Sequence, residues 1–88
     1  MKGYLYIIQS LKNSRYYVGS SVNVERRLEE FHNKRKVVAT RLLVPWKLRF
    51  KKEYESIGEA RITERKIKMK KSKIIIEKII YNNKCVIK

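Results

Sequence analysis

The first twenty residues constrain the fold most, because they carry the pattern of a β-hairpin. Residues 2–10 predict a strand, residues 11–14 a turn and residues 15–19 a second short strand. Along the first strand, side chains alternate between two faces: Tyr4, Tyr6 and Ile8 on one, Leu5 and Ile7 on the other. We therefore expect two paired strands at the start of the chain.

The middle of the chain predicts a helix and a third strand. Asn23 is a suitable N-cap for a helix over residues 24–32. Residues 33–45 are basic and irregular, and end at the proline. Apolar and basic residues then alternate, which predicts a half-buried strand to about residue 54. Its buried face would carry Trp46, Leu48 and Phe50.

The last third predicts two helices. Ser56 and Glu59 have the spacing of a capping box, so we expect a helix from there to about residue 69, and a last helix near residues 73–81. The order β-β-α-β-α-α predicts an α+β fold, an α/β sandwich in which helices flank a small three-stranded antiparallel or mixed sheet.

Length and composition limit what this fold can hold. With 88 residues we expect one domain over residues 1–82 and a short tail over residues 83–88, leaving no room for an organic cofactor domain. A single cysteine excludes an internal disulfide and suggests a reducing, cytoplasmic setting. The apolar runs are too short for a membrane span, so we expect no membrane partner.

The charge is the strongest compositional signal. With 23 Lys and Arg against 8 Asp and Glu, the net charge is +15, which favours a polyanion partner, nucleic acid above all. The alternatives are a merely solubilising surface and a compositional bias toward lysine and isoleucine. The basic residues that we expect to follow a nucleic-acid backbone are Arg27, Lys34, Arg35, Lys36, Arg41, Lys66 and Lys70. Lys68 belongs to a run that we expect to face solvent for the most part.

Two charged residues lie where helices should pack. At about 100° per residue, Glu64 falls on the stripe that includes Ala60 and Ile67, where a lone carboxylate is costly. It is therefore either a divalent-metal ligand, or a carboxylate that pairs with a nearby arginine or extends to solvent. Arg27 falls at the border of the stripe Val24, Leu28 and Phe31, where it could bind a phosphate or pair with a surface glutamate.

Tyr6 and Tyr17 lie on paired strands and could direct two hydroxyls at one point. A phenol has a free pKa near 10, so it needs a nearby cation or metal-bound water to act as a base. Cross-strand packing is the alternative role.

Taken in order, several short motifs resemble those of the GIY-YIG nuclease superfamily. They are YLY at 4–6, YVGSS at 17–21, NVERRL at 23–28, and EA at 59–60 followed by Glu64. The likeness covers roughly residues 3–80. It is greatest to small stand-alone members, which are similar in turn to the N-terminal nuclease domain found in the excision-repair endonuclease. Thr40 and the PWKL run at 45–48 also resemble this subgroup.

The resemblance implies a metal-dependent phosphodiesterase that cuts DNA, with selectivity for structure or weakly for sequence, in repair or recombination. Glu64 would bind one Mg²⁺ or Mn²⁺, and Arg27 would contact the phosphate. Tyr6 would be the general base and Tyr17 its hydrogen-bonding partner, although these two roles could be exchanged. A non-catalytic DNA- or RNA-binding module and a basic structural protein are the alternative functions. A protein partner or a dimer stays open.

One departure concerns the helix that carries Arg27. Many relatives have a His or Tyr four residues after this arginine, where this chain has Phe31. His32 follows one residue later, about 140° from Arg27 on a regular helix. It could be catalytic only if the helix end is distorted, and would otherwise be a partly exposed helix-end residue. Ser20 is a smaller departure, because some relatives have a lysine there.

Overall fold

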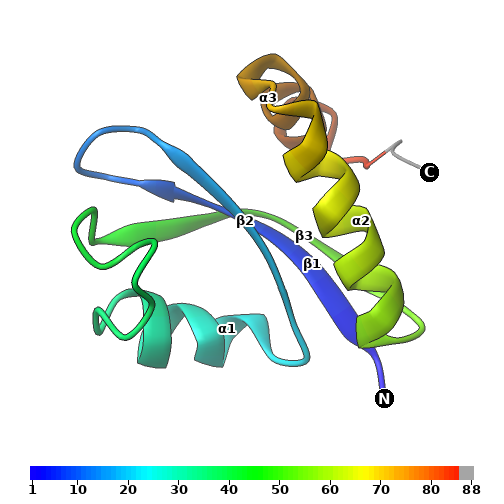
Figure 1. The fold of residues 1–88 in the computed structure, drawn as a ribbon, viewed down its shortest axis with the longest axis horizontal. Coiled ribbons are helices and arrows are strands. Elements are labelled where there is room, and N and C mark those ends of the chain that lie inside the picture. Colours follow the sequence, from blue (N-terminus) through cyan, green and yellow to red (C-terminus); the bar gives the residue numbers. More distant parts are fainter. Residues whose placement is uncertain (86–88) are drawn as a thin grey trace.

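The computed structural model describes residues 1–85, so residues 86–88 of the predicted tail lie outside the described part. Along the chain follow β1 (Gly3–Ser10), β2 (Tyr16–Ser21), α1 (Val24–Arg26), η1 (Arg27–His32), β3 (Trp46–Tyr54), α2 (Ile57–Lys70) and α3 (Lys73–Asn82) (Figure 1). The expected α+β order is confirmed, with the first helix divided in two. In residues 1–85 no helix combines the length and the apolar character needed to cross a membrane.

The three strands form one antiparallel sheet in the order β2-β1-β3. β1 is central because both of its faces are apolar: Leu5, Ile7 and Ile8 have no exposed surface and Tyr6 is almost fully buried. β2 pairs with β1 in a register that places Tyr6 opposite Gly19 and Leu5 opposite Ser20. β2 is therefore an edge strand, open on the side away from β1.

β3 differs from the predicted simple alternation. Ile8 pairs with Leu48 but Ile7 pairs with Phe50, so Arg49 is an extra residue that bulges out of the pairing. A bulge shifts the side-chain alternation by one residue. Trp46 therefore packs on one face of the sheet and Phe50 on the other. The expectation that both lie on one buried face is wrong for this reason.

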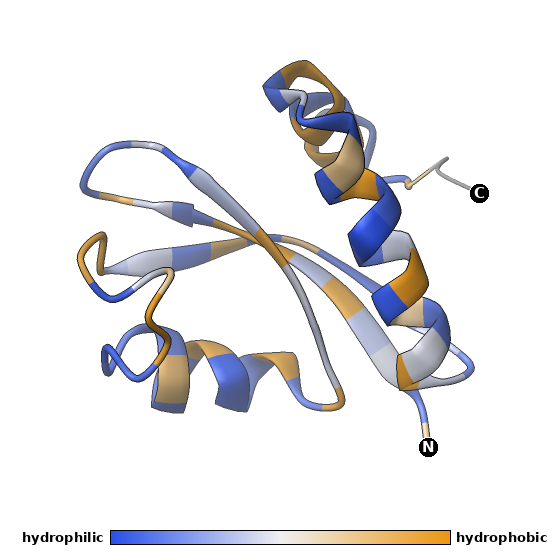
Figure 2. Ribbon diagram, viewed as in Figure 1, coloured by the Kyte–Doolittle hydropathy of each residue, from blue (hydrophilic) through white to orange (hydrophobic). Residues whose placement is uncertain are grey.

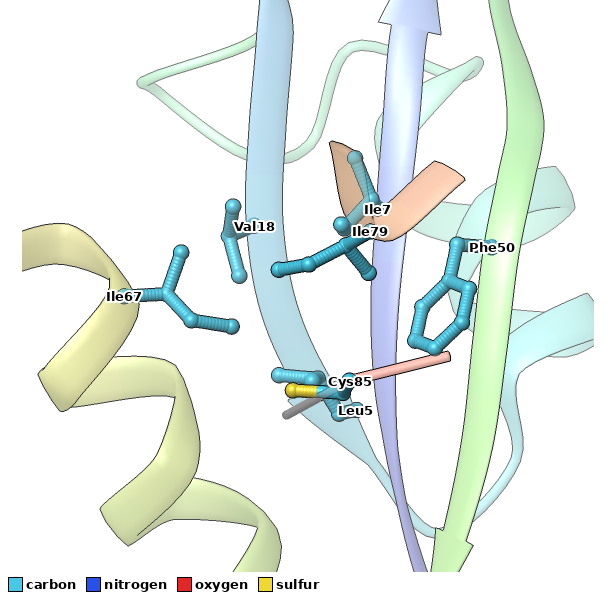
Figure 3. Packing of buried hydrophobic residues seen from close by; sticks show 7 residues of the cluster. All are labelled: Leu5, Ile7, Val18, Phe50, Ile67, Ile79 and Cys85. Atoms are coloured by element: carbon cyan, nitrogen blue, oxygen red, sulfur yellow. The ribbon is translucent and has the colours of Figure 1, made fainter. Parts of the chain in front are cut away.

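Helical layers cover the two faces of the sheet (Figure 1). α2 and α3 cover one face, where Ile67 and Ile79 pack against Ile7, Val18 and Phe50 (Figure 3). Buried Cys85, three residues beyond α3, joins this cluster. α1, η1 and the residues before β3 cover the other face, in a cluster of Tyr6, Ile8, Val24 and Trp46. Hydrophilic and hydrophobic residues alternate along α2, as expected of a helix with one packed face (Figure 2).

The helix predicted over residues 24–32 is not regular. It starts as expected, with the Asn23 side chain accepting from the Arg26 N–H, but η1 is a π-helical turn. The Asn33 N–H donates to the Leu28 carbonyl at 2.9 Å, five residues back. This wider turn brings a residue five positions on to nearly the same side of the helix. His32 is therefore fully buried and Phe31 only half-buried, so Phe31 does not belong to the predicted buried stripe.

Candidate nuclease site at the edge strand

β2 carries the site because it lies between the two helical layers and has a free edge. Tyr17 lies on the face covered by η1, whereas Ser20 lies on the face covered by α2. Between them is Gly19, directly opposite Tyr6. A Cβ at Gly19 would lie 2.5 Å from the hydroxyl oxygen of Tyr6. The missing side chain thus allows the Tyr6 ring to lie across β2, so that its hydroxyl reaches toward the open edge.

A chain of buried polar groups holds the Tyr6 hydroxyl. Its oxygen lies 2.7 Å from Nε2 of His32, and Nδ1 of His32 lies 2.9 Å from Oγ1 of Thr40. The Thr40 hydroxyl in turn donates to the Val37 carbonyl at 3.4 Å. The Tyr17 ring packs against the same imidazole in a T-shaped arrangement, with 5.1 Å between centroids. Both predicted tyrosines therefore contact His32, which is not the partly exposed helix-end residue that a regular helix would give.

Neighbouring contacts orient His32. The Asn33 side chain accepts from the Trp46 N–H at 2.6 Å and donates to its carbonyl at 3.2 Å, which ties the end of η1 to β3. The Trp46 indole donates to the Thr40 carbonyl at 2.9 Å. The imidazole is thus held from both sides by hydrogen-bonded groups.

Burial sets the protonation of this chain of groups. Burial raises the pKa of Tyr6 to about 12; the nearby phenol of Tyr17 and the carboxylate of Glu64 add to this, whereas the guanidinium of Arg27 opposes it. Burial also lowers the pKa of His32 to about 4, and the positive charge of Arg27 acts in the same direction. Tyr6 and His32 are therefore both neutral near pH 7.

The shifted pKa of His32 predicts a loss of stability in acid. His32 has a pKa near 4 in the folded chain and near 6.5 in the unfolded chain, so the unfolded chain binds its proton more readily between these values. The contribution of neutral His32 to the free energy of unfolding is fully present above pH 6.5. It falls by about 3 kcal/mol as the pH is lowered to 4. Urea unfolding at pH 7 and pH 4 should therefore show the stability advantage of wild type over His32→Gln shrinking by that amount. An advantage that is the same at both pH values would contradict the buried neutral imidazole.

Glu64 approaches the edge strand from the other layer. Its Oε1 accepts a hydrogen bond from the Ser20 hydroxyl at 2.6 Å, and its Oε2 lies 2.6 Å from Nζ of Lys68. Only 20% of the Glu64 side chain is exposed. The carboxylate is therefore in an ion pair, but its partner is a lysine one helical turn away and not the expected arginine. It also faces a hollow lined by Arg61, Arg65 and Lys71.

Arg27 lies half-buried near the hydroxyl of Tyr6. Its guanidinium carbon is 4.9 Å from the centroid of the Phe31 ring. In residues 1–85 Arg27 forms no ion pair, whereas its neighbour Arg26 pairs with Glu30 at 2.8 Å. Arg27 and Arg26 line a second hollow beside the end of β2. The guanidinium is therefore available to an anion at this edge.

The contacts join residues from both layers into one site. Tyr6 and Tyr17 meet at His32, Nζ of Lys68 lies 5.2 Å from the centroid of the Tyr17 ring, and Lys68 contacts Glu64. The other basic residues expected to contact nucleic acid are exposed and lie outside this site. Lys34, Arg35, Lys36 and Arg41 lie between η1 and β3, and Lys66 and Lys70 on the outer side of α2.

Comparison with known protein families decides the identity of this arrangement. The family model described as the GIY-YIG catalytic domain matches residues 2–81. The chain belongs to the GIY-YIG family. Neither a search of curated proteins nor a search of solved structures gave a match. The GIY-YIG domain has a nuclease-type fold, its members are usually nucleases that bind DNA, and they generally use divalent metals.

Three residues of this GIY-YIG site are not identified as functional by the sequence. In the sequence, Ser20 is notable only because some relatives have a lysine there, and Thr40 only contributes to the family resemblance. In the structure, Ser20 hydrogen-bonds to Glu64 and Thr40 hydrogen-bonds to His32. Lys68 belongs to a run expected to face solvent. Its spacing of four residues from Glu64 is the signal that could have identified the ion pair.

Proposed function

We propose that this GIY-YIG chain is a divalent-metal-dependent endonuclease that hydrolyses phosphodiester bonds in DNA. The observation that carries the proposal is the meeting of Tyr6, Tyr17, Arg27 and Glu64 at the open edge of β2, from four separate elements. A binding module has no need of a half-buried carboxylate next to two tyrosines and a free guanidinium. Nuclease chemistry uses each of them.

His32 supports Tyr6 as the general base. All three contacts of this chain of groups are hydrogen bonds if Thr40 donates to Val37, Nδ1 of His32 donates to Thr40, and Tyr6 donates to Nε2. The proton of Tyr6 then has an acceptor already in place. As the phenol oxygen takes a proton from the attacking water, it passes its own to Nε2, so no free phenolate forms. Because the pKa of His32 is about 4, the imidazolium is short-lived and returns the proton to Tyr6 after the phosphodiester bond is cut.

Arg27 and Glu64 act on the phosphate. The Arg27 guanidinium has the fork geometry to hold two phosphoryl oxygens, and its charge favours the added negative charge of the transition state. The Glu64 carboxylate fits an oxygen-preferring cation, because Mg²⁺ commonly takes one or two carboxylates together with substrate phosphates. In residues 1–85 no cluster of three His, Cys, Asp or Glu side chains could form a fuller metal cage. When bound, the cation would neutralise charge on the phosphate and on the leaving 3′ oxygen.

The DNA substrate would be selected mainly by shape. The surface beside the site is basic on both sides, with Arg61 and Arg65 near Glu64 and Arg26 near Arg27. Such contacts hold phosphates and carry no direct sequence information. We therefore propose structure-selective or weakly sequence-selective cutting, of the kind that DNA repair or recombination requires.

The proposal is tested with the purified protein on supercoiled plasmid and on branched and single-stranded oligonucleotides. Each substrate is incubated with Mg²⁺, with Mn²⁺, or with EDTA followed by excess Mg²⁺. We expect cleavage that requires the metal and returns when it is restored, with nicked circles as the first plasmid product, because one site cuts one strand. Salt-sensitive binding without cleavage under any metal would overturn the proposal in favour of the binding module.

A further inference from the structure

The carboxylate of Glu64 already forms an ion pair with a cationic side chain of the same protein. Lys68 lies one helical turn further along α2, and its Nζ is 2.6 Å from Oε2 of Glu64. Because Ser20 donates to Oε1, both carboxylate oxygens are engaged. In residues 1–85 this lysine is the one cation that forms an ion pair with Glu64. Its ammonium also faces the Tyr17 ring at 5.2 Å, within range of a cation–π attraction.

Lys68 therefore differs from the other lysines of its run. All three of Lys66, Lys68 and Lys70 are exposed, but Lys66 and Lys70 form no ion pair within residues 1–85. Lys68 instead lies on the side of α2 that faces β2, where it has two partners belonging to the candidate site. The Lys68 ammonium opposes the binding of a second cation to Glu64 in two ways: it is bonded to Oε2, and its charge repels the second cation.

We propose that Lys68 competes with the divalent cation for Glu64 and so weakens metal binding when no DNA is present. This inference rests on the proposed role of Glu64 as a metal ligand. A cation that takes the Oε2 lone pair bonded to Lys68 displaces the ammonium, and one that binds elsewhere on the carboxylate is repelled by it. The released Lys68 then faces the hollow that it shares with Arg61 and Arg65, where a DNA phosphate would be its next partner. Metal binding and DNA binding would thus favour each other. The metal frees the Lys68 ammonium for a DNA phosphate, and the phosphate holds that ammonium away from Glu64.

Mn²⁺ binding to the full chain tests this competition without any cleavage. Free Mn²⁺ is measured by electron paramagnetic resonance in titrations of wild type, Lys68→Met, Lys66→Met, Glu64→Gln and the double variant Lys68→Met/Glu64→Gln. Met is a good helix former of similar length, and circular dichroism checks that each variant folds. Lys66→Met is the matched control, because it removes the same charge from the exposed side of the same helix.

We expect Lys68→Met to bind Mn²⁺ about three- to fivefold more tightly than wild type, the upper part of the range for losing one half-exposed ion-pair partner. Lys66→Met should stay within about twofold, since its charge is screened by solvent. The double variant should lose the gain. Equal or weaker binding by Lys68→Met, in a protein whose Mn²⁺ affinity does depend on Glu64, overturns the competition and leaves the proposed nuclease intact. Binding that is independent of Glu64 in both backgrounds overturns the metal role of Glu64 as well.

Discussion

Replacing Glu64 with Gln is expected to slow DNA cleavage by at least about 10³-fold, which corresponds to about 4 kcal/mol of transition-state stabilisation. The amide keeps the size of the side chain and can still accept the hydrogen bond from Ser20. It loses the charge that would hold a divalent cation. DNA affinity should stay within about twofold or rise slightly, because the variant removes one negative charge from a surface that binds phosphates.

The matched control is Glu59→Gln. Glu59 lies in the first turn of the same helix and is exposed, and it contributes to the start of α2 only through its backbone N–H, which donates to the Ser56 side chain. Single-turnover cleavage and fluorescence anisotropy, at one salt concentration, give rate and affinity separately. A Glu64→Gln protein that cleaves at the wild-type rate would contradict the metal role. Parallel loss of cleavage and of binding would instead mean that the carboxylate supports the fold.

Local sequence signals were sufficient for most of the fold. Asn23 and Ser56 were expected to begin helices, and each side chain accepts the expected backbone hydrogen bond. These signals are reliable because the capping residue satisfies N–H groups within three residues of itself. The strands were predictable for a similar reason, since alternation along a strand depends on neighbouring residues.

Features that depend on distant residues were not predictable in the same way. The bulge at Arg49 exists only in relation to β1, so the residues of β3 alone could not indicate that Phe50 changes face. The π turn of η1 also depends on residues far away in the sequence. It brings His32 under Tyr6, where burial and hydrogen bonds to Tyr6 and Thr40 favour it over a regular turn that would bury Phe31.

Phe31 illustrates how this limits an inference about activity. Counting four residues from Arg27 leads to a phenylalanine, which cannot transfer a proton. The wider turn of η1 places the next residue at the tyrosine instead. Under the proposed function, backbone geometry thus supplies His32 where the family spacing leads to Phe31, and the Tyr6–His32 pair is the part of the site that most deserves a mutational test.

Replacing Tyr6 with Phe is expected to lower the single-turnover cleavage rate by about 10²- to 10⁴-fold, the usual contribution of a positioned general base. The ring would still lie across Gly19, so DNA binding should persist. Loss of the hydroxyl leaves Nε2 of His32 buried without its partner, which should cost about 1–3 kcal/mol of unfolding free energy. Urea unfolding measures this cost separately from the rate.

Two other tyrosines serve as comparisons for Tyr6. Tyr4 lies two residues earlier on β1, and its hydroxyl donates to Glu53 at 3.1 Å, away from His32, so Tyr4→Phe should cleave at close to the wild-type rate. Tyr17 packs against the imidazole in a T-shaped arrangement, which phenylalanine preserves, so Tyr17→Phe should lose less activity than Tyr6→Phe. The opposite order would assign the base to Tyr17. The proton path through His32 would then lack its donor, because the hydrogen bond at 2.7 Å belongs to Tyr6.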